Sequence, residues 1–205
     1  MISAVDALLR LREGNGRFVS GEVSEIALAS REHRAGKAMP QNPFAIILAC
    51  SDSRVPTELI FDRGIGDLFV IRVAGNIVAP SQIGSIEFAA EQFNTQLVVV
   101  LGHSDCGAII ATLQELALKE PHRSPNLRAI VDRVRPAVEP VLKDNDDVDD
   151  AIVISRCVRA NVQASVEQLQ NGSLILESLI STGDLQIIGA EYSIENGGIE
   201  FFEDD

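Results

Sequence analysis

Residues 44–50 read FAIILAC, and two similar runs follow: LFVIRVA at 68–74 and LVVVLG at 97–102. Each run is short, rich in β-branched residues and apolar at consecutive positions, which is typical of strands buried on both faces of a parallel sheet. Helical patterns come after the second and third runs, at residues 83–93 (IGSIEFAAEQF) and 107–118 (GAIIATLQELAL). Strands that alternate with helices predict an α/β fold.

The two ends of the chain add to this sheet. Residues 2–18 have an amphipathic helical pattern that Gly14-Asn15-Gly16 is expected to break, and residues 19–42 have no strong period. Residues 124–181 have a helical pattern, punctuated by two internal prolines and an acidic loop. We expect a central, mostly parallel β-sheet flanked by helices, with a further helix at the N-terminus.

A hairpin is predicted at the C-terminal edge of the sheet. Residues 185–194 (LQIIGAEYSI) have the pattern of a strand, and Asn196-Gly197 predicts a tight turn into a last strand at 198–202.

Size and charge exclude several classes of protein. The 205 residues, 46% of them hydrophobic, are enough for one core, so a single domain spanning 1–205 is expected. A net charge of -13 repels phosphate backbones and anionic membranes, so we expect no nucleic-acid or membrane partner. No run approaches the ~20 apolar residues of a membrane helix, and the charged N-terminus does not resemble a secretion signal. A cytoplasmic location is expected.

Soft ligands follow two of the predicted strands. Cys50 ends the first run, and His103 and Cys106 follow the third, in CSDSR (50–54) and HSDC (103–106). The carboxyl ends of parallel strands meet at one edge of a sheet, where ligands bind. Two thiolates and an imidazole suit Zn²⁺, and three protein ligands leave the fourth position open, as in catalytic zinc sites. A single buried cysteine is more often a packing residue, so the coincidence of the two motifs carries this hypothesis.

Asp52 and Arg54 lie within reach of Cys50. An aspartate beside a metal is either a ligand or a proton acceptor, and an arginine two residues later can hold it by a bidentate pair. The third cysteine, Cys157, falls on a predicted helix far from both motifs, where we expect a packing role.

CSDSRVP followed by HSDCGA resembles the β-class carbonic anhydrases, and the similarity extends over nearly the whole chain. It includes four further stretches: LREGNGRF near the N-terminus, GDLFVIRVAGN (66–76), GSIEFA (84–89) and EYSIENG (191–197). The resemblance implies an N-terminal helical arm (1–40), a zinc-site core (41–118) and a helical segment with the final strands (119–205).

The resemblance also implies the roles of the site residues. Cys50, His103 and Cys106 would bind zinc, and Asp52 and Arg54 would form a catalytic dyad that orients zinc-bound hydroxide for attack on CO₂, giving bicarbonate and a proton. In a closed state Asp52 would itself ligate zinc. The residues implied for substrate binding are Gln41, Phe69, Val73 and Gly107. His122 is a candidate proton shuttle, although an exposed loop histidine without a role is the simpler interpretation.

Two alternatives stay open at this point. The first is hydrolysis of a CO₂-like sulfur compound, carbonyl sulfide or carbon disulfide, which related β-class proteins perform on the same zinc site. The second is a non-catalytic zinc-binding paralogue. The resemblance further implies a homodimer or homotetramer in which the N-terminal arm contacts the neighbouring subunit.

Overall fold

The computed structural model of the chain describes residues 2–22, 41–118, 124–143 and 151–202. Within them, five strands form one sheet in the order β2-β1-β3-β4-β5. The strands are β1 (Ala45–Ala49), β2 (Leu68–Arg72), β3 (Leu97–His103), β4 (Gln186–Tyr192) and β5 (Ile199–Phe201). The first four are parallel and β5 is antiparallel to β4, which confirms the predicted mostly parallel sheet and its C-terminal edge hairpin.

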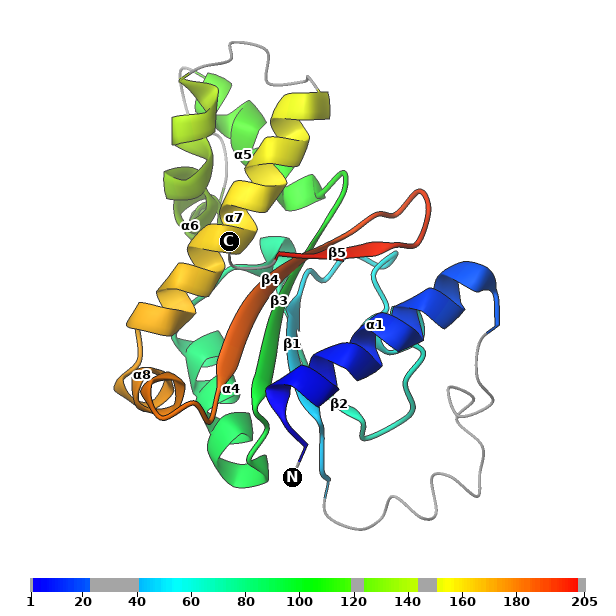
Figure 1. The fold of residues 1–205 in the computed structure, drawn as a ribbon. Helices are drawn as coiled ribbons and strands as arrows, with labels where there is room; N and C mark the ends of the chain where they lie inside the picture. Colours follow the sequence, from blue (N-terminus) through cyan, green and yellow to red (C-terminus); the bar gives the residue numbers. More distant parts are fainter. Residues whose placement is uncertain (1, 23–40, 119–123, 144–150, 203–205) are drawn as a thin grey trace.

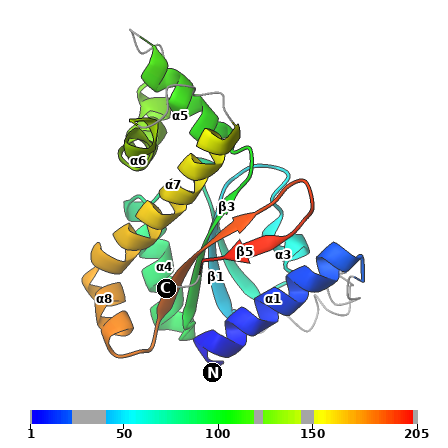
Figure 2. The ribbon, with the colours of Figure 1, turned by 45° about the horizontal axis from the view of Figure 1, so that its top comes forward.

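Helices cover both faces of the sheet (Figures 1 and 2). One face packs against α1 (Ala4–Ser20) and α3 (Thr57–Ile60), and the other against α4 (Pro80–Phe93), α7 (Ala151–Asn171) and α8 (Leu174–Ser181). Every residue of β1 and β3 is buried, which explains why their sequences are apolar at consecutive positions rather than alternating.

A third apolar cluster lies beyond the carboxyl ends of the strands. It is formed by α5 (Gly107–Ala117), α6 (Pro125–Leu142) and the first half of α7, and it includes Cys50 and Cys106. The end of the sheet where the two motifs meet is therefore covered by helices. No helix within the described ranges is both long and apolar enough to cross a membrane.

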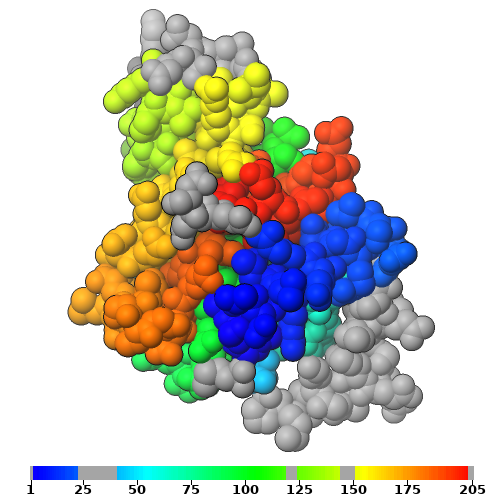
Figure 3. Space-filling view, in the orientation of Figure 1, coloured from blue at the N-terminus to red at the C-terminus, as the bar shows by residue number. Residues whose placement is uncertain are grey.

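The expected break in the first helix is wrong, because α1 runs without interruption from Ala4 to Ser20. Gly14 is buried, and a Cβ placed on it would lie 1.9 Å from the carbonyl oxygen of Phe61. Asn15 donates hydrogen bonds to the carbonyl oxygens of Ile60 and Gly197, at 3.1 and 2.8 Å. The Gly-Asn-Gly segment therefore serves close packing rather than a turn, and it fixes α1 against the β5 hairpin (Figure 3).

The helix α6 likewise continues through prolines 136 and 140, which the sequence pattern suggested as interruptions. Both prolines are on its exposed side, so the carbonyl groups left without an intrahelical partner face water.

Gly14 and Gly16 provide a matched pair of substitutions. Gly14→Ala should destabilise the protein by about 1–3 kcal/mol because the added methyl group clashes with the Phe61 backbone. Gly16→Ala meets nothing within 4 Å and should stabilise the helix by about 0.5–1 kcal/mol. Urea denaturation of both variants measures the two effects, and a destabilising Gly16→Ala or a neutral Gly14→Ala would contradict this packing.

Candidate metal centre

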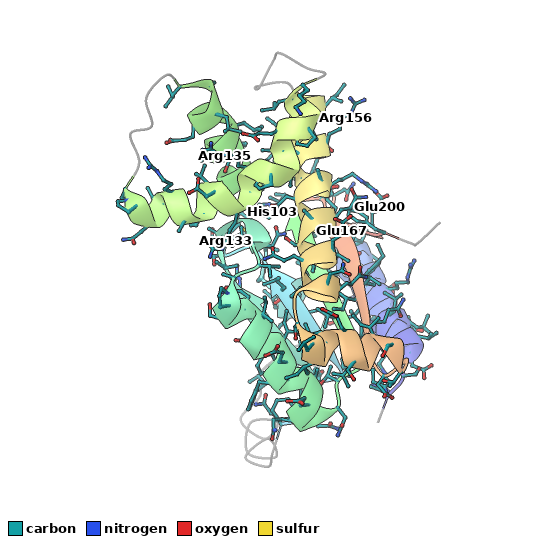
Figure 4. The ribbon with its side chains drawn as sticks, turned by 90° about the vertical axis from the view of Figure 1, so that its left-hand side faces the viewer. His103, Arg133, Arg135, Arg156, Glu167 and Glu200 are labelled. Carbon is teal, nitrogen blue, oxygen red and sulfur yellow. The ribbon has the colours of Figure 1, made fainter. Side chains whose placement is uncertain are left out.

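The two motifs meet at the carboxyl ends of β1 and β3, which are hydrogen-bonded neighbours in the sheet. Cys50 directly follows β1, His103 ends β3, and Cys106 is the N-cap residue of α5. The ligand atoms of these three residues lie within 4.8 Å of one another, and all three residues are buried. Figure 4 shows His103 from the side of α6 and α7.

The orientation of His103 suits a metal ligand. Its Nδ1 lies 2.9 Å from the carbonyl oxygen of Ser104, an acceptor that places the proton on Nδ1. The Nε2 atom is buried and has no hydrogen-bond partner among the described residues. A buried polar atom without a partner is costly, and a metal ion between Nε2 and the two sulfur atoms would satisfy it.

Each of the two cysteines affects the protonation of the other. The pKa of the Cys50 thiol is lowered mainly by a hydrogen bond from Cys106, against the opposing effect of burial, and Gly75 also donates its backbone N–H to Cys50 Sγ at 3.3 Å. The pKa of Cys106 is raised because it shares this proton with Cys50 and is buried. One thiolate is therefore favoured even with a proton between the sulfur atoms, and a zinc ion would replace that proton.

Asp52 and Arg54 form a bidentate pair at the rim of this group. Arg54 Nε and NH2 donate to the two carboxylate oxygens of Asp52 at 3.0 and 2.8 Å, and the Arg54 backbone N–H donates to Oδ1 at 2.9 Å. These bonds hold the pKa of the Asp52 carboxyl well below its usual range. Asp52 Oδ2 lies 3.9 Å from His103 Nε2, so an ionised carboxylate faces the ligand group.

The family model described as carbonic anhydrase matches residues 45–199. The chain belongs to the β-carbonic anhydrase family.

Curated relatives and solved structures agree with this assignment. Carbonic anhydrase 2 of Mycobacterium tuberculosis is 38% identical over 195 residues, which cover 94% of this chain and 90% of the relative. A carbonic anhydrase of Mycolicibacterium smegmatis is 36% identical and covers 96% of this chain and 92% of its own. The solved structure of the β-carbonic anhydrase CcaA superposes with a TM-score of 0.74 at 29% identity, over 96% of this chain and 95% of that chain.

Four residues are expected to contact the substrate. Within one chain, not all of them lie close to the group of Cys50, His103 and Cys106. Val73 donates its backbone N–H to the carbonyl oxygen of Ala49 at 3.1 Å and packs against the cluster that contains both ligand cysteines. Gly107 is exposed at the first residue of α5, and the space beside its Cα is open. Both residues are next to the metal group, which consists of Cys50, His103 and Cys106.

Gln41 and Phe69 lie elsewhere. Gln41 precedes the amino end of β1, whereas Cys50 follows the carboxyl end, and β1 alone spans about 13 Å between its first and last Cα atoms. Phe69 pairs in register with Ile46, near the amino end, and its ring contacts those of Phe88 and Phe93. Within a single chain these two residues are far from the ligand group. The candidate shuttle His122 lies outside the described residues.

Sequence reasoning missed two groups that support the loop after β1. Arg72 donates to the carbonyl oxygens of Cys50 and Asp52, at 3.0 and 2.5 Å, and Gly75 donates its backbone N–H to Cys50 Sγ. Arg72 ends β2, the other neighbour of β1, and Gly75 lies in the loop that follows it. The stretch RVAGN at the carboxyl end of this strand was the signal, because three adjacent parallel strands bring three loops to one edge.

Cys157 provides a test of the ligand set. It is buried on α7 within the third apolar cluster, and burial raises its pKa to about 11, so its thiol is neutral. Cys157→Ala should therefore retain the wild-type metal content and activity, with a stability loss of about 1 kcal/mol. Elemental analysis of the purified variant checks this, and a fall in bound metal would mean that the ligand set is wrong.

Proposed function

We propose that the chain catalyses the reversible hydration of CO₂ to bicarbonate and a proton, with zinc bound by Cys50, His103 and Cys106. The observation that carries the proposal is the buried group of three ligand atoms within 4.8 Å, in which His103 Nε2 has no other partner among the described residues. Two sulfur atoms and one imidazole nitrogen are a donor set that zinc prefers, and three ligands leave one position for a reactant.

Asp52 and Arg54 are proposed to act together. When bound, zinc would supply a Lewis acid that activates water near neutral pH. Asp52 would accept a hydrogen bond from this water and orient it toward CO₂, because its carboxylate faces the ligand group from 3.9 Å. Arg54 keeps Asp52 ionised, and its guanidinium also approaches the carbonyl oxygen of Asp105 at 3.4 Å, which ties the two motif loops together.

The same pair is proposed to control a closed state. For Asp52 to become a fourth zinc ligand, it must give up its two side-chain hydrogen bonds with Arg54. Since Arg54 holds the pKa of Asp52 well below its usual range, protonation of Asp52 does not open or close the site near neutral pH. The competition is between Arg54 and the metal for one charged carboxylate.

Val73 and Gly107 are proposed to contact CO₂ from the chain that binds the zinc. Gln41 and Phe69 would have to come from a neighbouring subunit, because both lie toward the amino ends of their strands in their own chain. A homodimer or homotetramer is therefore part of the proposal. We also propose a cytoplasmic location.

Two β-carbonic anhydrases of Sordaria macrospora with solved structures are tetrameric. The matched one is 25% identical to this chain, with a TM-score of 0.74 over 84% of this chain and 87% of its own. Although α1 packs on its own sheet, it leaves Val5 and Leu9 exposed for a neighbour.

Two substitutions separate metal binding from chemistry. Cys50→Ser should lose both zinc and CO₂ hydration, because it removes a thiolate ligand. Asp52→Asn should keep zinc and lose at least about a hundredfold in kcat/KM, because an amide cannot replace the carboxylate as acceptor. Zinc content and stopped-flow CO₂ hydration of both variants provide the test.

The ligand assignment would be wrong if Cys50→Ser kept one zinc per chain. Rates with carbonyl sulfide and carbon disulfide, measured beside the CO₂ rate on the wild-type protein, identify the preferred substrate. A faster reaction with a sulfur compound would replace the proposed substrate, and no reaction with any of the three would mean that the chain is a non-catalytic relative.

Mixing two impaired variants tests the role of the neighbouring subunit. Gln41→Ala should lower CO₂ hydration about tenfold or more, and Cys50→Ser should abolish it. If Gln41 acts on the partner's zinc, hetero-oligomers of the two variants contain one site with both an intact ligand set and an intact Gln41, so activity should return. Mixed oligomers no more active than the separate variants would show that Gln41 does not act across the interface.

A further inference from the structure

A buried asparagine on α7 is connected to the metal group through one turn of the main chain. Asn161 is 3% exposed and donates a hydrogen bond from Nδ2 to the carbonyl oxygen of Gly75 at 2.9 Å. Gly75 in turn donates its backbone N–H to Cys50 Sγ at 3.3 Å. Asn161 thus lies two hydrogen bonds from a ligand sulfur, on a helix that contributes no ligand of its own.

The turn between them has a specific conformation. Asn76 donates its N–H to the carbonyl oxygen of Val73 at 3.0 Å, and Gly75 has φ 70° and ψ 20°, as the third residue of a type II turn requires. Asn76 is also left-handed, at φ 42°. A left-handed conformation is unfavourable for a residue other than glycine, so surrounding contacts must hold Asn76 in this turn.

Those contacts come from α7. Asn161 bonds the carbonyl oxygen of Gly75, and Ser165, one helical turn later, donates to the carbonyl oxygen of Asn76 at 3.3 Å. Both side chains are on the same face of the helix and are buried. On its other side the turn packs against α5, because a Cβ on Gly75 would lie 3.1 Å from that of Ala108. The turn is held between the two helices.

We infer that Asn161 is a positioning residue for zinc binding: it fixes the turn at Gly75 so that the Gly75 N–H stays directed at the Cys50 thiolate. An N–H···S hydrogen bond offsets part of the negative charge on a ligand sulfur and fixes its direction, and outer contacts of this kind contribute to metal affinity. The inference rests on the proposed function, because it takes Cys50 to be a zinc ligand.

Removing Asn161 should therefore weaken a site that it does not touch. Asn161→Leu keeps the branched shape and the number of side-chain heavy atoms but has no donor, which leaves the buried Gly75 carbonyl unpaired and lets the turn move. We expect zinc affinity of the full chain to fall about tenfold or more, measured by competition with a chromophoric chelator. In the cobalt-substituted protein, the thiolate-to-Co²⁺ charge-transfer band should shift, because the Cys50 sulfur loses its hydrogen bond.

Asn15 supplies the matched control. It is also a buried asparagine whose amide donates to two main-chain carbonyl groups, but these belong to Ile60 and Gly197, away from the metal group. Asn15→Leu should lower the melting temperature without changing zinc affinity or the cobalt spectrum. Asn161→Ser, which leaves a polar side chain in the same place, should fall between the wild type and Asn161→Leu, and it replaces Asn161→Leu if that variant does not fold.

The outcomes are distinguishable. If the wild-type chain binds zinc and the Asn161 variants bind it as tightly, with an unchanged cobalt spectrum, the inference is overturned and the proposed function stands. Equal losses of zinc affinity in the Asn15 and Asn161 variants would also overturn it, because the effect would then reflect general stability. If the wild-type chain binds no zinc, both the proposed function and the inference fail.

Discussion

The structure depends on bringing two thiols and an imidazole together in one buried corner of the fold. Two thiolates would repel one another in such a place, and an unpaired imidazole nitrogen is costly. The parallel sheet imposes this arrangement, because β1 and β3 are neighbours and end at the same edge. A metal ion bound there would offset both costs at once, which makes the group of Cys50, His103 and Cys106 the central feature of the fold.

The elements around the group are arranged to keep that corner rigid. Arg72 holds the loop after β1 through two carbonyl oxygens, and Gly75 contacts the Cys50 sulfur from the loop after β2. The helices α5, α6 and α7 close the corner with an apolar cluster. Burial then decreases from His103, which is fully covered, to Asp52 and to Arg54, whose side chain is half exposed. The charged rim is therefore open to solvent, whereas Cys50, His103 and Cys106 behind it are buried.

Sequence patterns predicted the parts of this arrangement that are local. The consecutive apolar residues of β1 and β3 require a sheet covered on both faces, and soft ligands at two strand ends predict a shared site. Close approaches between distant segments leave no such pattern: Gly14 was expected to break a helix because nothing in its neighbourhood announces the Phe61 backbone. The Asn161 contact with Gly75 joins residues 86 positions apart. Within its own chain Phe69 lies against Phe88 and Phe93, so the substrate role that the family resemblance implies for it stays a prediction that requires a neighbouring subunit.

X-ray absorption at the zinc edge of the purified chain tests the central claim most directly, because it reports the number and kind of atoms bound to the metal. The account predicts two sulfur atoms at about 2.3 Å, one imidazole nitrogen and one further light atom at about 2.0–2.1 Å. Three or four sulfur atoms, a shell without sulfur, or a chain that retains no zinc would contradict it.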